Sequence, residues 1–120
     1  MGPAALLRWQ WDGYPRYHQS RTNLLLHIVV VPLFLAGNGA LVVRLVSGSF
    51  LEAGLGAMAM VASAALQGVG HRTEPVPPEP FTSPWNAVAR LFLEQWITFP
   101  RFVLSGKWLR ALRQSAGQAR

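Results

Sequence analysis

Two long stretches of apolar residues dominate the pattern along the chain. One runs from Leu24 to Val43 and the other from Phe50 to Val69, and only residues 44–49 separate them. A helix rises about 1.5 Å per residue, so about 20 residues span roughly 30 Å, the thickness of the hydrocarbon core of a bilayer. The pattern therefore predicts a transmembrane helical hairpin, with helices over residues 24–43 and 50–69.

Small residues recur four apart in the second stretch: Ala53 and Ala57, Ala59 and Ser63. This spacing lets two helices approach closely, which favours a packed pair in a membrane. Two alternatives stay open for the first stretch. Pro32, Gly37 and Gly39 interrupt this stretch, so it could instead be a core helix of a soluble protein. The small residues 36–40 resemble the cleavage site of a secretory signal.

The flanking segments predict no further span. Residues 1–23 form a polar N-terminal arm, and residues 74–84 form an extended connector rich in proline. Ser83 followed by Pro84 is typical of a helix start and predicts interfacial amphipathic helices over residues 85–112, with a frayed tail over 113–120. The predicted fold class is an all-α membrane protein of one domain, a transmembrane hairpin followed by interfacial helices.

Composition and charge agree with a membrane protein. Half of the chain, 51%, is hydrophobic and only 13% is charged, whereas about a quarter of the residues of soluble domains are charged. Ten of the eleven basic residues flank the hairpin and only Arg44 lies in its turn. The positive-inside rule then places both termini in the cytoplasm. Membrane orientation and anionic lipids thus explain the net charge of +6 without a nucleic-acid partner.

Polar residues gather at the cytoplasmic ends of the two predicted helices. Asn23 and His27 are four residues apart and share one helix face, as do Gln67, His71 and Glu74 at spacings of four and three. An antiparallel hairpin brings the start of its first helix beside the end of its second. The two sets are therefore predicted to lie at one level, where polar groups are costly and usually functional.

His18 lies nine residues before His27, on the opposite side of a continuous helix. It can join the others only if the chain turns before the span, with Ser20 or Thr22 as N-cap. Three imidazoles and one carboxylate, in a chain without cysteine, suit Fe(II), Zn(II) or Mn(II). The predicted metal ligands are His18, His27, His71 and Glu74. Asn23 and Gln67 are expected to fix the orientation of the imidazoles.

The segment from Tyr17 to Pro32 resembles the H-x4-N-x3-H-x4-P opening of a small membrane-protein family. A second motif of this family, a Gly-His pair that ends a hydrophobic span and is followed by Glu and Pro, is similar to residues 70–75. The family is that of the 2-hydroxy fatty acid dioxygenases, whose yeast member acts in phytosphingosine breakdown. The two motifs span residues 17–75, somewhat over half of the chain.

The resemblance implies an Fe(II)-dependent α-oxidation, in which a 2-hydroxy fatty acid and O2 yield CO2 and a fatty acid one carbon shorter. It implies that the site is carried by the matching residues, with His71 and Glu74 in the chemistry: His18, Asn23, His27, His71 and Glu74. Arg21 and Arg72 are candidates for pairing with the substrate carboxylate. The short chain, with residues 94–106 in place of further spans, looks like a bacterial branch and implies a bacterial inner membrane.

Two other functions use the same residues. In a non-catalytic membrane adaptor, the His, Asn, Gln and Glu side chains would only tie helices together by hydrogen bonds. In a zinc-dependent membrane hydrolase, the same ligands would hold Zn instead of Fe(II). Two spans bury little of their own surface, so the sequence also leaves open whether lipid or a second copy of the chain covers the rest.

Overall fold

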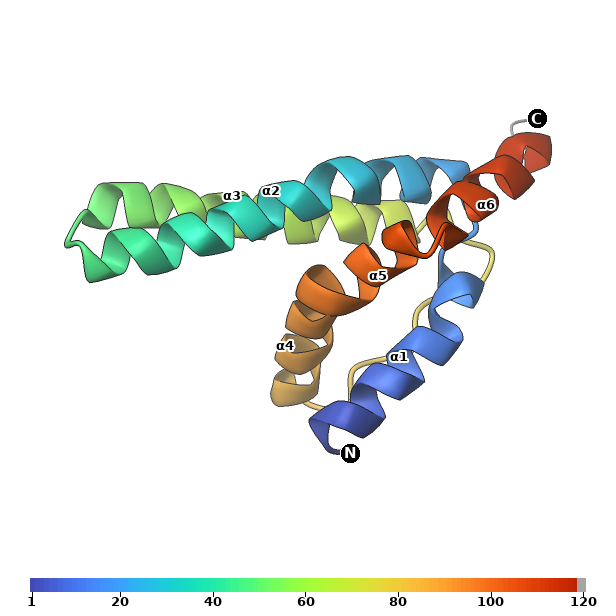
Figure 1. Ribbon diagram of the computed structural model, residues 1–120, viewed down its shortest axis with the longest axis horizontal. Coiled ribbons are helices and arrows are strands. Elements are labelled where there is room, and N and C mark those ends of the chain that lie inside the picture. Colours follow the sequence, from blue (N-terminus) through green and yellow to red (C-terminus); the bar gives the residue numbers. More distant parts are fainter. Residues whose placement is uncertain (119–120) are drawn as a thin grey trace.

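In a computed structural model, which describes residues 1–118, the two apolar stretches form a long antiparallel hairpin (Figure 1). Its helices are α2, Arg21–Val46, and α3, Phe50–His71. The Ser20 side chain caps α2 by accepting a hydrogen bond from the amide of Asn23, and Gly48 makes the turn with a φ of 78°, which glycine adopts at no steric cost. Both helices are long and apolar enough to cross a membrane, which confirms that part of the prediction.

The two helices of the hairpin meet at a pair of glycines. A Cβ atom on either Gly37 or Gly56 would lie only 2.6 Å from the carbonyl oxygen of the other. Five residues of α3 are buried: Ala53, Gly56, Ser63, Gln67 and Gly70. Most of them are small, and the Ser63 hydroxyl donates to the carbonyl of Val30. The close approach predicted from the small residues is therefore present.

Replacing Gly56 by alanine is expected to destabilise the hairpin. Because the new methyl group would press on the backbone of α2, we expect the free energy of unfolding to fall by about 1–3 kcal/mol, as in other overpacked contacts. Gly54 on the same helix is the matched control, because a Cβ there meets no atom within 4 Å. Gly54→Ala should raise stability by up to about 1 kcal/mol, the helix propensity of alanine over glycine. Denaturant unfolding in micelles would measure both, and equal effects would contradict the close contact.

Most of the segment predicted as a polar N-terminal arm is a helix. Helix α1, Pro3–Tyr17, begins with proline at its first position and buries Leu6 and Tyr14. The chain then bends at His18, and α2 begins directly after Ser20. The chain thus turns before the span, and of the two candidate N-caps, Ser20 and Thr22, it is Ser20 that caps α2. The arm is helical because its apolar and aromatic residues pack on the rest of the molecule, a contact that its polar composition did not indicate.

The C-terminal segments fold back over the open end of the hairpin. No helix is present between α3 and α4, Pro84–Leu93, which Ser83 caps as predicted. The chain continues as a π-helix, η1, and two short α-helices, and ends in a single 3₁₀ turn: η1 Glu94–Thr98, α5 Phe99–Leu104, α6 Lys107–Gln114 and η2 Ser115–Gln118. Part of the predicted frayed tail is therefore helical, while residues 119 and 120 lie outside the described part of the chain.

A small aromatic core joins these segments to the hairpin. Tyr14, Leu24, Val31, Phe99 and Phe102 form its buried cluster. Further along α2, the rings of Phe34 and Phe92 pack edge to face, which fixes α4 across the middle of the helix. The segments predicted to lie flat at the membrane surface are thus held against the hairpin by packing.

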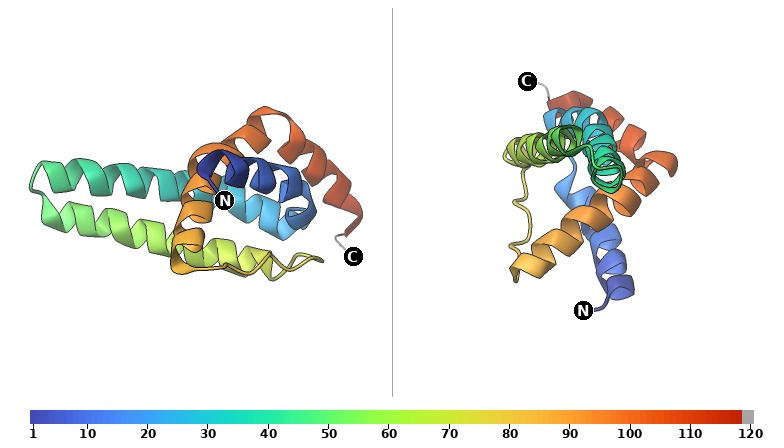
Figure 2. Two further views of the ribbon diagram at one scale, coloured as in Figure 1. Left: turned by 90° about the horizontal axis from the view of Figure 1, so that it is seen from below. Right: turned by 90° about the vertical axis from the view of Figure 1, so that its left-hand side faces the viewer.

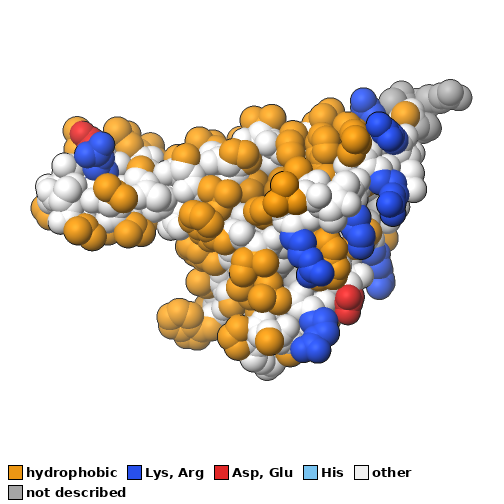
Figure 3. Space-filling model, in the orientation of Figure 1, with side chains coloured by type: hydrophobic (Ala, Val, Ile, Leu, Met, Phe, Trp, Pro, Cys, Tyr) orange, Lys and Arg blue, Asp and Glu red, His pale blue; other side chains and the backbone are white. Residues whose placement is uncertain are grey.

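The turn end of the hairpin projects beyond all other helices (Figures 1 and 2). Apolar side chains cover it, and an ion pair between Arg44 and Glu52, 2.7 Å long, lies near its tip. Lys and Arg side chains gather at the opposite end of the molecule, on the side of α1 and α6 (Figure 3). The fold therefore separates an apolar hairpin tip from a basic opposite end, as expected for a hairpin inserted into a membrane from one side.

Candidate metal centre

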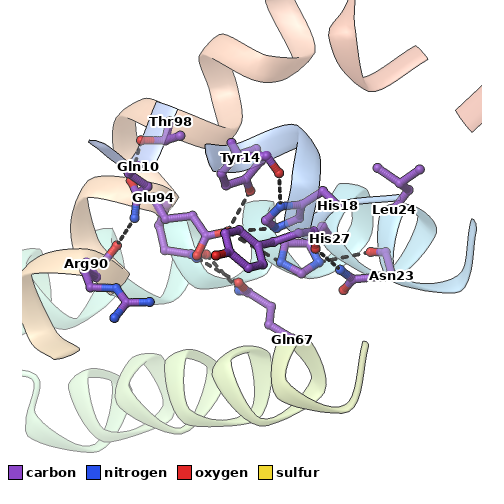
Figure 4. A network of polar contacts seen from close by, with 12 residues as sticks. Gln10, Tyr14, His18, Asn23, Leu24, His27, Gln67, Arg90, Glu94 and Thr98 are labelled. Atoms are coloured by element: carbon purple, nitrogen blue, oxygen red, sulfur yellow. Dashed lines mark hydrogen bonds and ion pairs between the residues drawn. The ribbon is translucent and has the colours of Figure 1, made fainter. Parts of the chain in front are cut away.

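Four side chains from four segments converge at the base of the hairpin. They are His18 at the bend before α2, His27 in α2, His71 at the end of α3 and Glu94 at the start of η1. One nitrogen or oxygen of each lies within 4.8 Å of all the others. The three imidazole rings are nearly perpendicular to one another, with centroids 4.9–5.1 Å apart. Figure 4 shows His18, His27 and Glu94 pointing toward one another.

Backbone carbonyls orient two of the imidazoles. His18 Nδ1 lies 2.8 Å from the carbonyl oxygen of Tyr14, and His27 Nδ1 lies 3.0 Å from that of Asn23. A carbonyl oxygen only accepts, so Nδ1 carries the proton in both rings and Nε2 keeps its lone pair. Both Nε2 atoms are thereby directed into the cluster, with lone pairs that could bind a metal ion.

The nitrogen atoms that face the cluster have no hydrogen-bond partner. This holds for Nε2 of His18, Nε2 of His27 and Nδ1 of His71, all of them buried. Buried polar atoms are almost always satisfied, and a metal ion bound between these nitrogens and the nearby carboxylate would satisfy them. Three imidazole nitrogens and one carboxylate oxygen are a donor set that Fe(II) and Zn(II) both accept. The residues present therefore fit a divalent metal ion.

Glu94 supplies the negative charge of the cluster. Its Oε2 atom lies 3.4 Å from His18 Nε2 and 3.7 Å from His27 Nε2. Burial alone would raise the pKa of Glu94, but the nearby imidazoles of His18 and His27, when protonated, and the Tyr14 hydroxyl together lower it to about 2. The carboxylate is thus ionised at neutral pH and favours positive charge in the site, carried by protons or by a metal.

Tyr14 contacts two members of the cluster at once. Its ring stacks on the His18 imidazole, with centroids 3.7 Å apart, and its hydroxyl donates to Glu94 Oε2 at 2.6 Å. Burial, and then the negative charge of Glu94, raise the pKa of Tyr14 well above its usual value. The phenol therefore stays protonated and holds the carboxylate in place.

The π-helix explains how Glu94 reaches the cluster. Glu94, Gln95 and Thr98 all point inward from η1, and Gln95 and Thr98 are fully buried. The wider turn of a π-helix changes the direction in which successive side chains project, and such turns are frequent at functional sites. Sequence reasoning missed Glu94, because its spacing from Arg90 is also that of the polar face of an amphipathic helix.

Glu74, the carboxylate predicted from the sequence, lies outside the group of four. Its oxygens accept hydrogen bonds from the backbone amides of Gln19 and Ser20 and from the side chain of Asn23. The physical reason is that α3 ends at His71, so the helical spacing that would place Glu74 beneath His71 does not apply. Glu74 instead ties the end of α3 to the bend before α2.

Of the other predicted residues, some lie at the cluster or its cavity and some do not. Asn23 orients His27 through its backbone carbonyl. Gln67 forms no hydrogen bond with a histidine in the described part of the chain and exchanges two hydrogen bonds with Gln95, each 2.8 Å long. Arg21 donates to a carbonyl of α6. Arg72 is exposed and lies at the edge of a cavity beside the cluster. Of the two arginines predicted to meet a carboxylate, only Arg72 borders this cavity.

This cavity has a volume of about 980 Å³ and lies between α1, α3, α4 and the proline-rich connector. His18, His71 and Glu94 form part of its wall, so a molecule inside it would touch the cluster. Its volume is at the upper end of the range for small-molecule sites. A smaller cavity of about 230 Å³, between α1 and α6, contains none of the four residues. No protein family, curated protein or solved structure matches this chain.

Proposed function

We propose that this protein is a membrane-bound, Fe(II)-dependent dioxygenase that shortens 2-hydroxy fatty acids by one carbon. The observation that carries the proposal is the set of three buried imidazole nitrogens, without hydrogen-bond partners, directed at one point beside Glu94. The resemblance of residues 17–75 to the 2-hydroxy fatty acid dioxygenases supports iron as the metal and a 2-hydroxy acid as the substrate.

The reaction balances without an outside reductant. The bond between C1 and C2 of the hydroxy acid breaks, C1 leaves as CO2, and C2 becomes the carboxyl carbon of the shorter acid. The substrate loses four electrons, O2 gains four, and one water forms. When bound, Fe(II) supplies the redox chemistry that couples O2 to this oxidation.

The chain's own residues have separate tasks in this proposal. His18, His27, His71 and Glu94 hold the metal, and Tyr14 keeps the carboxylate and one imidazole in position. Because they lie at the base of the apolar hairpin, the site is at the depth of the lipid headgroups. The carboxylate of a membrane-embedded fatty acid would meet the site there, with both termini and most of the basic residues on the cytoplasmic side of a bacterial inner membrane.

The geometry favours a metal centre over the adaptor, but it does not distinguish the two metalloenzymes. In an adaptor, the imidazoles would link helices by hydrogen bonds, yet the nitrogens facing the cluster make none. A zinc hydrolase would use the same four ligands, so the donor atoms do not distinguish it. The identity of the bound metal and the dependence on O2 do.

Protein purified in detergent without oxygen and loaded with Fe(II) is expected to consume one O2 for each 2-hydroxypalmitate converted to pentadecanoate. Oxygen uptake and mass spectrometry of the product would measure this ratio, and palmitate is the control substrate, since it lacks the 2-hydroxyl group. Zn(II) rather than Fe(II) in the purified protein, with no uptake of O2, would favour the hydrolase. If neither metal binds, the adaptor remains.

A further inference from the structure

The geometry points to a binding groove for a fatty acyl chain between α3 and α4, within the cavity of about 980 Å³. This inference rests on the proposed function for the identity of the polar end of the ligand. It adds the path of the hydrocarbon tail and names Gly68 as the residue that keeps this path open. Neither was predicted from the sequence.

Small and apolar side chains form the two walls of the groove. Ala64 and Gly68 line it from α3, and Ala87 and Leu91 line it from α4. In each pair the residues are four apart, so each wall follows one face of its helix. Two such faces leave a continuous apolar channel rather than isolated pockets, which suits an unbranched hydrocarbon chain.

Gly68 marks open space along this channel. A Cβ atom built on Gly68 meets nothing within 4 Å, although the residue lies in the wall of the cavity. Glycine in the interior of a helix costs about 1 kcal/mol relative to alanine, and no tight contact requires it here. A ligand that fills the space beside Gly68 would explain why this residue has no side chain.

The polar end of the groove is chemically distinct. Gly68 is one helical turn from His71, and His18 Nε2, which is buried and unpartnered, also faces the cavity. The guanidinium of Arg72, next in sequence to His71, makes no hydrogen bond or ion pair within residues 1–118, while Glu74 and Glu94 at the same end are engaged by other side chains. A carboxylate placed there would find a free cation as well as the metal ligands.

The outer edge of the groove is apolar and exposed. Phe81 and Val88, which also line the cavity, are 60% and 46% exposed, and α3 is one of the two helices able to cross a membrane. An acyl chain could therefore enter sideways from the bilayer with its tail never passing through water. A water-soluble ligand would gain nothing from this arrangement.

The test compares Gly68→Leu with Gly54→Leu in the full-length protein. Both glycines lie in α3 with open space around them, but only Gly68 lines the groove. Binding is measured with the fluorescent fatty acid cis-parinaric acid, which carries no 2-hydroxyl group and so reports binding without the proposed reaction. We expect Gly68→Leu to weaken binding at least about tenfold, with helical content and metal content unchanged, and Gly54→Leu to bind like the wild type.

The outcomes separate the groove from the proposed reaction. If Gly68→Leu blocks the probe while the wild type fails to oxidise 2-hydroxypalmitate, the acyl site stands and the dioxygenase proposal fails. If the wild type is active but both variants bind the probe equally well, the reaction stands and the groove is wrong. A wild-type protein that does not bind the probe also overturns the groove.

Discussion

Replacing His27 by alanine is expected to remove the metal from the protein. The wild type should hold about one iron per chain after anaerobic loading, and the variant less than about a tenth of that, because one of the four proposed ligands is lost. Elemental analysis of purified protein would measure the content. The reaction with 2-hydroxypalmitate should be lost with the metal.

Controls must separate the loss of a ligand from the loss of the fold. His27 is fully buried, so its removal also leaves a cavity that destabilises the protein. His71→Ala, at a half-buried position, should lose iron as well with less structural damage. Asn38→Ala, three turns further along α2 and bonded to Trp96, should keep its iron. Retention of iron by both histidine variants would rule out the proposed centre.

Neutralising Glu94 and Glu74 separately is expected to give opposite results. Glu94→Gln should weaken metal binding by about 100-fold or more, since a neutral amide replaces the only carboxylate in the group of four. Mutating residues that merely hydrogen-bond to metal ligands already costs about 10–100-fold in metal affinity. Glu74→Gln should leave metal binding within a few-fold of the wild type. Competition with a fluorescent chelator would measure both affinities.

The expected defect of Glu74→Gln is in stability. Its carboxylate accepts hydrogen bonds from two backbone amides at the bend and from Asn23. Losing the charge on this acceptor should lower the free energy of unfolding by about 1–3 kcal/mol. If Glu74→Gln loses the metal and Glu94→Gln keeps it, the ligand predicted from the sequence is correct and the arrangement around Glu94 is not.

The stability of Gly56→Ala and the binding of fatty acid by Gly68→Leu test other parts of the molecule. The first concerns the contact between α2 and α3, and the second concerns the groove between α3 and α4. Because Gly54 serves as the control position for both, one set of α3 variants covers the hairpin and the groove. Neither experiment depends on the metal.

Much of the hairpin and three of the four clustered residues followed from the sequence. Apolar runs of about 20 residues predict long helices on length alone, and Ser20 and Ser83 mark helix starts by local hydrogen bonding. Since a short turn makes the helices antiparallel, the level at which His27 meets His71 could also be worked out. All of these depend on interactions between residues near one another in the chain.

The fourth member of the cluster and the proposed groove depend on how distant segments pack. Glu94 lies 67 residues after His27 in the numbering, and only the π-helix and the folding of α4 over α2 bring its carboxylate to the imidazoles. Glu74 had the right residue type at the expected spacing, yet the helix ended three residues too early for it. Local patterns specify where helices form, but where a side chain finally points is set by contacts between helices, which no periodicity along the chain encodes.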